Sequence, residues 1–414
     1  MRHRGTATCL LTLFSFAVVS CSDDEASSTT SSVKPNGVPT NVVDQTPATS
    51  TEPAATEPST TDLAGTEPAQ AILLPVPDGP FAVGVVDLQR FSMSAYYPAR
   101  EGTGHGHRDY ASPAMVGFFD ATAVDLAAIV PTAQISAEPL QDSGPWPVVI
   151  LAPGGGSFIE LSTSLAEHLA SHGYIVIAVQ PDIATDAGLH LGDGQFNDRE
   201  IQLLEQVSMA ARRTQIVDAL DLLDDPLTTE LVGPIDPTRV AAGGHSYGGS
   251  TAFNVSLADA RIAAAFDLDG TLFEEAGATP VSVPSLVLMA EMYAMSHTPP
   301  ETSGDPAGAA AAQAALDAFE LLRTAENTVS VALLDAGHYA VTDVPAIEAG
   351  LTGQLRTLAT DGLGRIGRAG TTNTNTIVLR FLDAALASQP RLPTAAELVA
   401  GLPSATADPF AEAD

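Results

Sequence analysis

One serine stands among glycines in the pentapeptide GHSYG at residues 244–248. A short apolar run at residues 240–242 precedes it, and a segment with helical character follows it at residues 249–258. A G-x-S-x-G pattern between a strand and a helix is typical of a nucleophile elbow, a strained turn that exposes the hydroxyl. A free hydroxyl is a weak nucleophile at neutral pH, so Ser246 needs a base.

His338 is the candidate base, because it lies just after the last predicted strand, at residues 329–334. A loop at that point can return to the strand ends beside Ser246. His245 is excluded as the base, since its side chain leaves the elbow in another direction, and we interpret it as packing around the turn. Three other histidines, on a helix, a turn and a loop, are interpreted as surface residues: His168, His172 and His190.

The histidine in turn needs an acid that fixes its tautomer and stabilises the imidazolium. Asp269 stands at the end of the strand predicted over residues 262–268, whereas Asp267 lies within that strand. Glu291 follows the strand predicted over residues 285–290, where many enzymes with this order of elements carry their acid. Spacing alone leaves Asp269 and Glu291 open.

Three glycines at residues 154–156 follow a buried-strand pattern at residues 148–152. A glycine loop lets backbone N–H groups approach a developing oxyanion, and we select Gly155 and Tyr247 as the two donors. A phosphate-binding role is disfavoured, because neither G-x-G-x-x-G nor Gly-Lys-Ser/Thr follows. His105 and His107 lack a third ligand at recognisable spacing, so we expect no metal and no cofactor.

Strand-like and helix-like segments alternate after residue 71, which predicts an α/β fold with a mostly parallel central sheet and helices on both faces. The predicted strands are residues 81–86, 90–97, 148–152, 174–179, 240–242, 262–268, 285–290 and 329–334. The predicted helices are residues 161–172, 199–223, 249–258, 309–325, 346–360 and 376–387, and residues 101–143 are expected to be mainly loops. Gly173 is the predicted C-terminal stop of its helix.

The chain of 414 residues is 45% hydrophobic and carries a formal net charge of -33. Such an acidic surface argues against nucleic acid or an anionic membrane surface as a partner. Arg2 and Arg4 precede a short apolar stretch at residues 7–19, which predicts an export signal over residues 1–20. Residues 18–21 resemble a lipoprotein box, so we expect Cys21 to be lipidated and to anchor the protein in the cell envelope. Without lipidation, the same signal would lead to a secreted protein.

Residues 21–71 are rich in Ser, Thr and Pro and are predicted to form a disordered tether. Residues 72–414 are then predicted to form one folded domain. Only two cysteines occur, Cys9 and Cys21, and Cys9 would leave with the signal, so no disulfide is expected. The oligomeric state cannot be predicted from these features.

Four segments resemble the α/β-hydrolase family of platelet-activating factor acetylhydrolases: VVILAPGGGSF, LAEHLASHGYIVIAV, GHSYGG, and FDLDGTLF before PSLVLMAE. The resemblance covers roughly residues 90–345, and chlorophyllase-like and cutinase-like polyester hydrolases share parts of it. It implies that Ser246 is the nucleophile and His338 the base, and it favours Asp269 over Glu291 as the acid. The expected activity is hydrolysis of short-acyl lipid or related carboxylic esters through an acyl-enzyme. Two alternatives are a secreted polyester or cutin depolymerase and a non-catalytic surface-binding lipoprotein.

Overall fold

The computed structural model describes residues 71–88, 92–118, 126–181, 198–270, 279–291, 324–348 and 363–407, with the single positions 272, 317 and 321. The predicted signal, Cys21 and nearly all of the predicted tether lie outside these residues. So do His190 and most of the helices predicted over residues 309–325 and 346–360. The boundary of the folded domain therefore stays a prediction at its N-terminal side.

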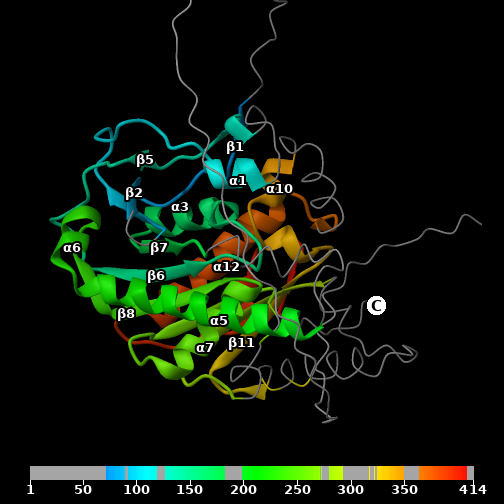
Figure 1. Cartoon of the computed structure of the whole chain (residues 1–414). Helices are drawn as coiled ribbons and strands as arrows, with labels where there is room; N and C mark the ends of the chain where they lie inside the picture. Colours follow the sequence, from blue (N-terminus) through cyan, green and yellow to red (C-terminus); the bar gives the residue numbers. More distant parts are fainter. Residues whose placement is uncertain are drawn as a thin grey trace, which may run out of the picture. The chain divides into compact units, whose positions relative to one another are not determined.

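A twisted sheet of ten strands forms the centre of the described structure, in the order β12-β11-β10-β9-β8-β6-β7-β3-β2-β5 (Figure 1). Six neighbouring strands, β11-β10-β9-β8-β6-β7, are mutually parallel. At the two ends of this block, β12 pairs antiparallel with β11, and β3 pairs antiparallel with β7. The bounds are β2 (Ala82–Leu88), β3 (Met93–Ala99), β5 (Gln134–Ile135), β6 (Trp146–Ala152), β7 (Ile175–Val179), β8 (Ile235–His245), β9 (Ala264–Leu268), β10 (Ser285–Ala290), β11 (Thr328–Leu333) and β12 (Ala405–Thr406). Strands β1 (Ile72–Leu73) and β4 (Ile129–Val130) form a separate parallel pair.

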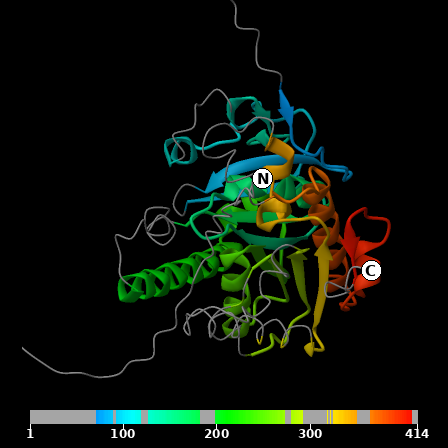
Figure 2. The ribbon, with the colours of Figure 1, turned by 90° about the vertical axis from the view of Figure 1, so that its right-hand side faces the viewer.

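Helices cover both faces of the sheet, as predicted (Figure 2). Helices α3 (Thr163–Ser171) and α12 (Ala369–Ala385) pack together on one face, and α5 (Asp198–Asp221) and α7 (Tyr247–Ala258) pack together on the other. The shorter elements are α1 (Pro113–Phe118), η1 (Ile159–Ser162), η2 (Leu222–Asp224), α6 (Pro226–Val232), η4 (His338–Val341), α10 (Val344–Ile347) and α13 (Ala395–Val399). In the described part of the chain, no helix combines the length and hydrophobicity needed to cross a membrane.

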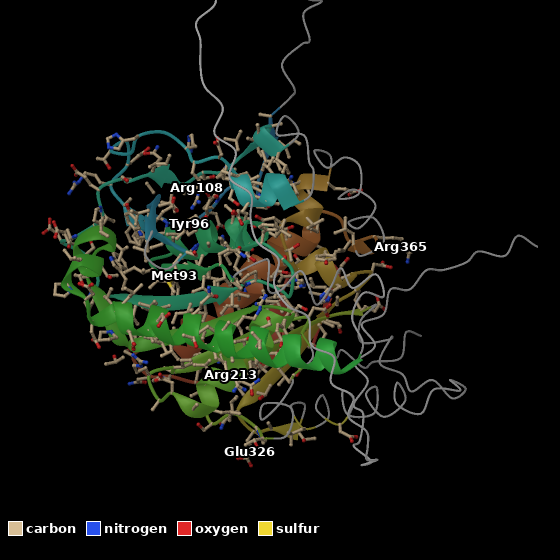
Figure 3. The ribbon with its side chains drawn as sticks, in the orientation of Figure 1. Met93, Tyr96, Arg108, Arg213, Glu326 and Arg365 are labelled. Carbon is tan, nitrogen blue, oxygen red and sulfur yellow. The ribbon has the colours of Figure 1, made fainter. Side chains whose placement is uncertain are left out.

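The continuous apolar runs of the inner strands follow from this double coverage. Along β6, Val149 and Leu151 enter the core beneath α3 and α12, whereas Val148 and Ile150 enter the core beneath α5 and α7. All four side chains are fully buried. Figure 3 shows the side chains on the ribbon, including the buried Met93 and Tyr96 of β3.

Two elements differ from the prediction in ways that have a physical cause. Helix α12 begins at Ala369 rather than at residue 376, because its first turns carry polar residues that the hydrophobic pattern does not count. Thr371 is nevertheless buried, and its hydroxyl donates to the Thr342 carbonyl over 2.8 Å. Strand β8 begins at Ile235, before the predicted residue 240, because Ile235 pairs with Trp146 of β6. Gly173 follows α3 with φ 95°, as expected for a helix stop.

Candidate active site

Ser246 occupies the turn between β8 and α7, at the carboxyl end of the parallel strands. Its backbone has φ 54° and ψ −123°, a conformation that a residue with a side chain rarely adopts. The Ser246 N–H donates to the Leu268 carbonyl at the end of the neighbouring strand β9 over 2.9 Å. The strained turn is thus held by the sheet, which is the arrangement of a nucleophile elbow.

The glycines on either side of the serine are required by the end of β6. A Cβ atom at Gly244 would lie 1.9 Å from the Ala152 carbonyl oxygen, and one at Gly248 would lie 2.3 Å from the same atom. Any side chain at either position would therefore push the elbow away from β6. The two glycines bring the serine turn against the strand that leads into the glycine loop.

Ser246, His338 and Asp269 form one chain of hydrogen bonds. His338 Nε2 lies 3.1 Å from Ser246 Oγ, and His338 Nδ1 lies 2.7 Å from Asp269 Oδ2. Asp269 follows β9, and His338 begins η4 after β11, so both come from the same edge of the sheet as the serine. Asp269 is fully buried, whereas the His338 side chain is 23% exposed. This geometry permits a proton to pass from the hydroxyl to the imidazole.

Asp269, and not Glu291, lies beside His338. The second Asp269 oxygen, Oδ1, accepts from the Ala290 N–H over 2.5 Å, which fixes the carboxylate plane. Glu291 instead accepts from the Asp335 N–H over 2.5 Å. Asp267 is fully buried, and this burial, followed by the charge of Asp269, raises its pKa well above 3.8. Asp267 is therefore a buried residue of the core and does not face His338 as Asp269 does.

His245 supports the loop that carries His338. Its Nε2 lies 3.0 Å from the His338 carbonyl oxygen, and because a carbonyl can only accept, Nε2 must carry the proton. Burial, and after it the neighbouring His338, lowers the pKa of His245 well below 6.5, which keeps the ring neutral. The two imidazole rings are in contact, with centroids 4.5 Å apart and an angle of 43° between their planes. The side chain does leave the elbow, as expected, and it holds the backbone of the candidate base.

The glycine loop after β6 is held by a residue that the sequence analysis missed. Arg212 of α5 is 1% exposed and donates to the Pro153 and Gly154 carbonyls, each over 2.8 Å. Its guanidinium also lies 5.2 Å from the centre of the Tyr247 ring. Arg213, the next residue on this helix, is labelled in Figure 3. Its position in the sequence could have indicated that Arg212 is buried, because it precedes Ile216 by four residues and so lies on the apolar face of the helix.

The two candidate oxyanion donors flank this arrangement. Gly155 lies in the turn that follows Pro153 and Gly154, and Tyr247 is the first residue of α7. The first N–H groups of a helix have no partner within the helix and point out of its N-terminus. Arg212 therefore contacts both donor segments, through the carbonyls of the glycine loop and the ring of Tyr247.

Of the other histidines considered, His105 and His107 are exposed. His168 differs from its expected surface position, since its side chain is only 12% exposed. It lies in the last turn of α3, whereas Ser246 precedes α7 on the other face of the sheet. Asp78 and His172 lie close to His168.

The sheet order, the helices on both faces and the serine turn define an α/β-hydrolase fold. A family model described as Chlorophyllase matches residues 121–270, which end just after Asp269. A solved ferulic acid esterase from Streptomyces cinnamoneus superposes with a TM-score of 0.59 at 26% identity, covering 81% of this chain and 98% of that one.

Two curated relatives have similar sequences. The platelet-activating factor acetylhydrolase of Cavia porcellus is 25% identical over 251 residues, which are 48% of this chain and 56% of the relative. A probable 1-alkyl-2-acetylglycerophosphocholine esterase of Arthroderma benhamiae is 27% identical over 131 residues, 31% of this chain and 33% of the relative. The chain thus spans between a third and about half of the curated relatives it matches. Together these findings show an α/β-hydrolase fold and a similarity to platelet-activating factor acetylhydrolases and to the Chlorophyllase family.

Proposed function

We propose that this protein is a serine carboxylic-ester hydrolase that works through an acyl-enzyme. The observation that carries the proposal is the hydrogen-bonded chain from Ser246 through His338 to Asp269, with the serine on a strained elbow. The names of the similar proteins, acetylhydrolase and esterase, agree with this chemistry. A binding protein without catalysis would not need a serine in this backbone conformation.

Each residue has a role in the proposed reaction. His338 Nε2 takes the proton of Ser246 Oγ as the oxygen attacks the ester carbonyl carbon. The Gly155 and Tyr247 N–H groups hold the resulting oxyanion. The carbonyl re-forms as the alcohol leaves with the proton from His338. Water then attacks the acyl-serine with His338 as base, releasing the acid and the free serine, while Asp269 stabilises the imidazolium in both halves.

Short-acyl lipid or related esters are the substrates we propose first, because the curated relatives are named for an acetyl ester of a glycerophosphocholine or for its hydrolysis. An aromatic acyl ester is a second candidate, favoured by the ferulic acid esterase, whose chain is matched almost in full. Parallel rates on a 2-acetyl phospholipid, methyl ferulate and a polyester film would rank the candidates.

Ser246→Ala tests the proposed reaction directly. We expect kcat/KM on p-nitrophenyl acetate to fall by about 10³-fold or more, because the nucleophile is removed while the fold is kept. A fluorophosphonate probe should label the unaltered protein at Ser246 and leave the variant unlabelled, as peptide mapping would show. Turnover and labelling that persist in a folded variant would overturn the assignment.

A further inference from the structure

Asp78, His168 and His172 form a second assembly of one aspartate and two histidines. His168 and His172 lie one helical turn apart at the C-terminal end of α3, so they share one face of the helix, with ring centroids 4.7 Å apart. Asp78 belongs to the segment that leads into β2. One ligand atom from each of the three residues lies within 4.8 Å of the others.

The two distances from Asp78 to the imidazoles suit ligands of one metal ion. Asp78 Oδ1 lies 3.4 Å from His168 Nδ1 and 3.5 Å from His172 Nε2. Both distances exceed the common range of N–H···O hydrogen bonds, about 2.7–3.2 Å. Ligand atoms bound about 2.0–2.1 Å from a tetrahedral zinc ion are about 3.3–3.4 Å apart, the edge of the tetrahedron.

The hydrogen bonds of His172 leave a lone pair directed at such an ion. His172 Nδ1 lies 3.1 Å from the His168 carbonyl oxygen, which can only accept, so Nδ1 carries the proton. His172 Nε2, which faces Asp78, therefore has the lone pair. A backbone carbonyl that binds the distal N–H is the usual support of a metal-ligating histidine. His168 Nδ1 also faces Asp78, and in the tautomer with its proton on Nε2 this nitrogen has a lone pair.

The electrostatic setting also favours a cation. The C-terminal end of a helix carries the negative end of its dipole, where a carboxylate is unfavourable. Asp78 nevertheless lies there, against two imidazole rings, with its side chain 79% exposed. A divalent ion between the three side chains would offset both the charge of Asp78 and the helix end.

The backbone places Asp78 before any ion binds. The Gly79 N–H donates to Ser171 Oγ over 3.2 Å, and the Phe81 N–H donates to the Ser171 carbonyl over 3.1 Å. A Cβ atom at Gly79 would lie 2.1 Å from that carbonyl oxygen, so only glycine permits this close approach. The segment before β2 is therefore held against the end of α3.

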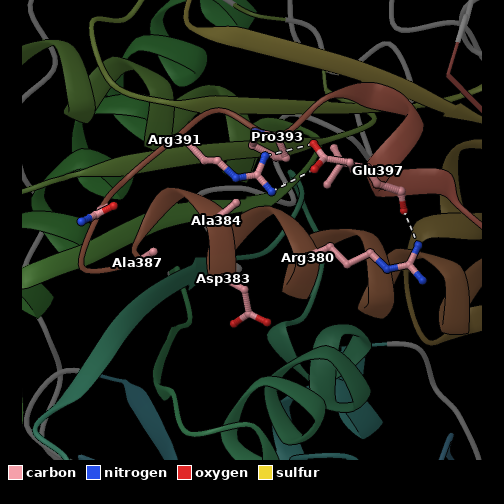
Figure 4. A pocket seen from close by; sticks show the side chains of 9 residues that line it. Arg380, Asp383, Ala384, Ala387, Arg391, Pro393 and Glu397 are labelled. Carbon is pink, nitrogen blue, oxygen red and sulfur yellow. Dashed lines mark hydrogen bonds and ion pairs between the residues drawn. The ribbon is translucent and has the colours of Figure 1, made fainter.

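A hollow of about 390 Å³ beside α12 and α13 provides a contrast (Figure 4). Its charged groups already have partners within the protein: Arg391 pairs with Glu397, Arg380 donates to the Leu398 carbonyl, and Asp383 accepts from the Tyr174 hydroxyl. Binding a ligand there would break existing interactions. Around Asp78, one carboxylate oxygen and two imidazole nitrogens lie within 4.8 Å of one another instead.

We propose that Asp78, His168 and His172 bind one Zn²⁺ ion, with water completing its coordination. Imidazole nitrogen and carboxylate oxygen are common zinc ligands, and histidines at i and i+4 on a helix are a recurrent source of two of them. The ion would tie the segment before β2 to the C-terminal end of α3. It lies beside the amino end of β7, away from the carboxyl ends where Ser246 stands, so it is a structural site independent of the proposed esterase.

Titration of the chelator-treated, untagged protein with Co²⁺ tests this site. We expect one equivalent to produce the strong visible absorption of low-coordinate cobalt, and one equivalent of Zn²⁺ to abolish it. Asp78→Asn and His172→Gln should each weaken Co²⁺ binding by about tenfold or more, since each removes a ligand. The control, His105→Gln with His107→Gln, should bind as the unaltered protein does.

The exposure of Asp78 makes the test decisive. Asp78→Asn changes a largely exposed side chain, so its fold and its rate on p-nitrophenyl acetate should be unchanged. The proposal is wrong if the unaltered protein shows no saturable absorption. It is equally wrong if binding survives in both Asp78→Asn and His172→Gln, or disappears in the control pair. None of these outcomes depends on whether the protein hydrolyses esters.

Discussion

Two assemblies of aspartate and histidine stand at opposite ends of the parallel strands. At the carboxyl ends, Asp269 is fully buried and its Oδ2 lies 2.7 Å from His338 Nδ1. At the amino end of β7, Asp78 is 79% exposed and its Oδ1 lies 3.4 Å and 3.5 Å from two imidazole nitrogens. The residue types are the same, whereas the separations and the burial differ.

The difference lies in how firmly each carboxylate is directed at its histidine. Asp269 has φ 59°, and its Oδ1 accepts from the Ala290 N–H. Its Oδ2 therefore faces a single imidazole nitrogen, Nδ1 of His338. A short bond of this kind selects one tautomer and stabilises a proton on the ring. Asp78 faces two rings at longer range, which leaves room for an ion between them. Identical residue types thus support proton transfer in one place and metal ligation in the other.

The largest expected effect is a difference in activity between the two assemblies when the same substitution, Asp→Asn, is made in each. Asp269→Asn should lower kcat/KM on p-nitrophenyl acetate by about 10³–10⁴-fold, because the amide favours the wrong tautomer of His338. Asp78→Asn should leave this rate unchanged. Steady-state kinetics on both purified variants provides the measurement, and equal losses in the two would remove the functional distinction between the assemblies.

The same experiment decides among the acids near His338. Asp267→Asn keeps the shape of a buried, protonated carboxyl, and Glu291→Gln alters a group that accepts from the Asp335 N–H. Both should retain activity within about tenfold. A loss in Glu291→Gln as large as in Asp269→Asn would transfer the role of the acid to Glu291.

An intermediate effect is expected from Arg212, which orders the backbone at the carboxyl edge. Arg212→Met removes both donors to the glycine loop, so the Gly155 N–H should be misplaced and kcat should fall by about 10–100-fold, with little change in KM. Arg391→Met, which breaks an exposed pair with Glu397, is the matched control and should keep kcat. Equal kcat values in the two variants would contradict a positioning role. Thermal unfolding of both variants separates loss of positioning from loss of the fold.

The smallest effect concerns stability and involves Glu167, the residue before His168 on α3. Its Oε1 accepts from the Thr132 and Ala133 N–H groups, and burial raises its pKa from 4.5 to about 8. The folded state therefore binds more protons than the unfolded state between about pH 4.5 and 8, so this group's contribution to stability falls as pH rises through that range.

Glu167→Gln should remove this dependence, because the amide oxygen can still accept both bonds and carries no charge. Relative to the unaltered protein, the variant should gain stability from pH 6 to pH 8, by at most about 1.4 kcal/mol per pH unit. Urea unfolding at the two pH values measures the gain. A difference between the two proteins that does not change with pH would show that Glu167 does not titrate in the folded state.

Much of the fold was predictable because the parallel strands are continuous apolar runs and the helices have apolar residues at regular spacing. Strands β10 and β11 lie close to their predicted ranges. The start of α12 was not predictable in this way, since Thr371 and Asn373 are buried there and donate to distant carbonyls, those of Thr342 and Pro403. Hydrophobic periodicity contains no information about hydrogen bonds between distant segments.

For the candidate site, the sequence determined which residue types occur and where the strands end. Ser246, Asp269 and His338 each follow a strand of one parallel sheet, and parallel strands bring such residues to one edge. Their order along the chain could not exclude Glu291. Only the tertiary structure decided that Asp269 meets His338, and that Arg212 holds the glycine loop. It also brought Asp78 to the two histidines of α3, because contacts between distant segments depend on packing and not on sequence spacing.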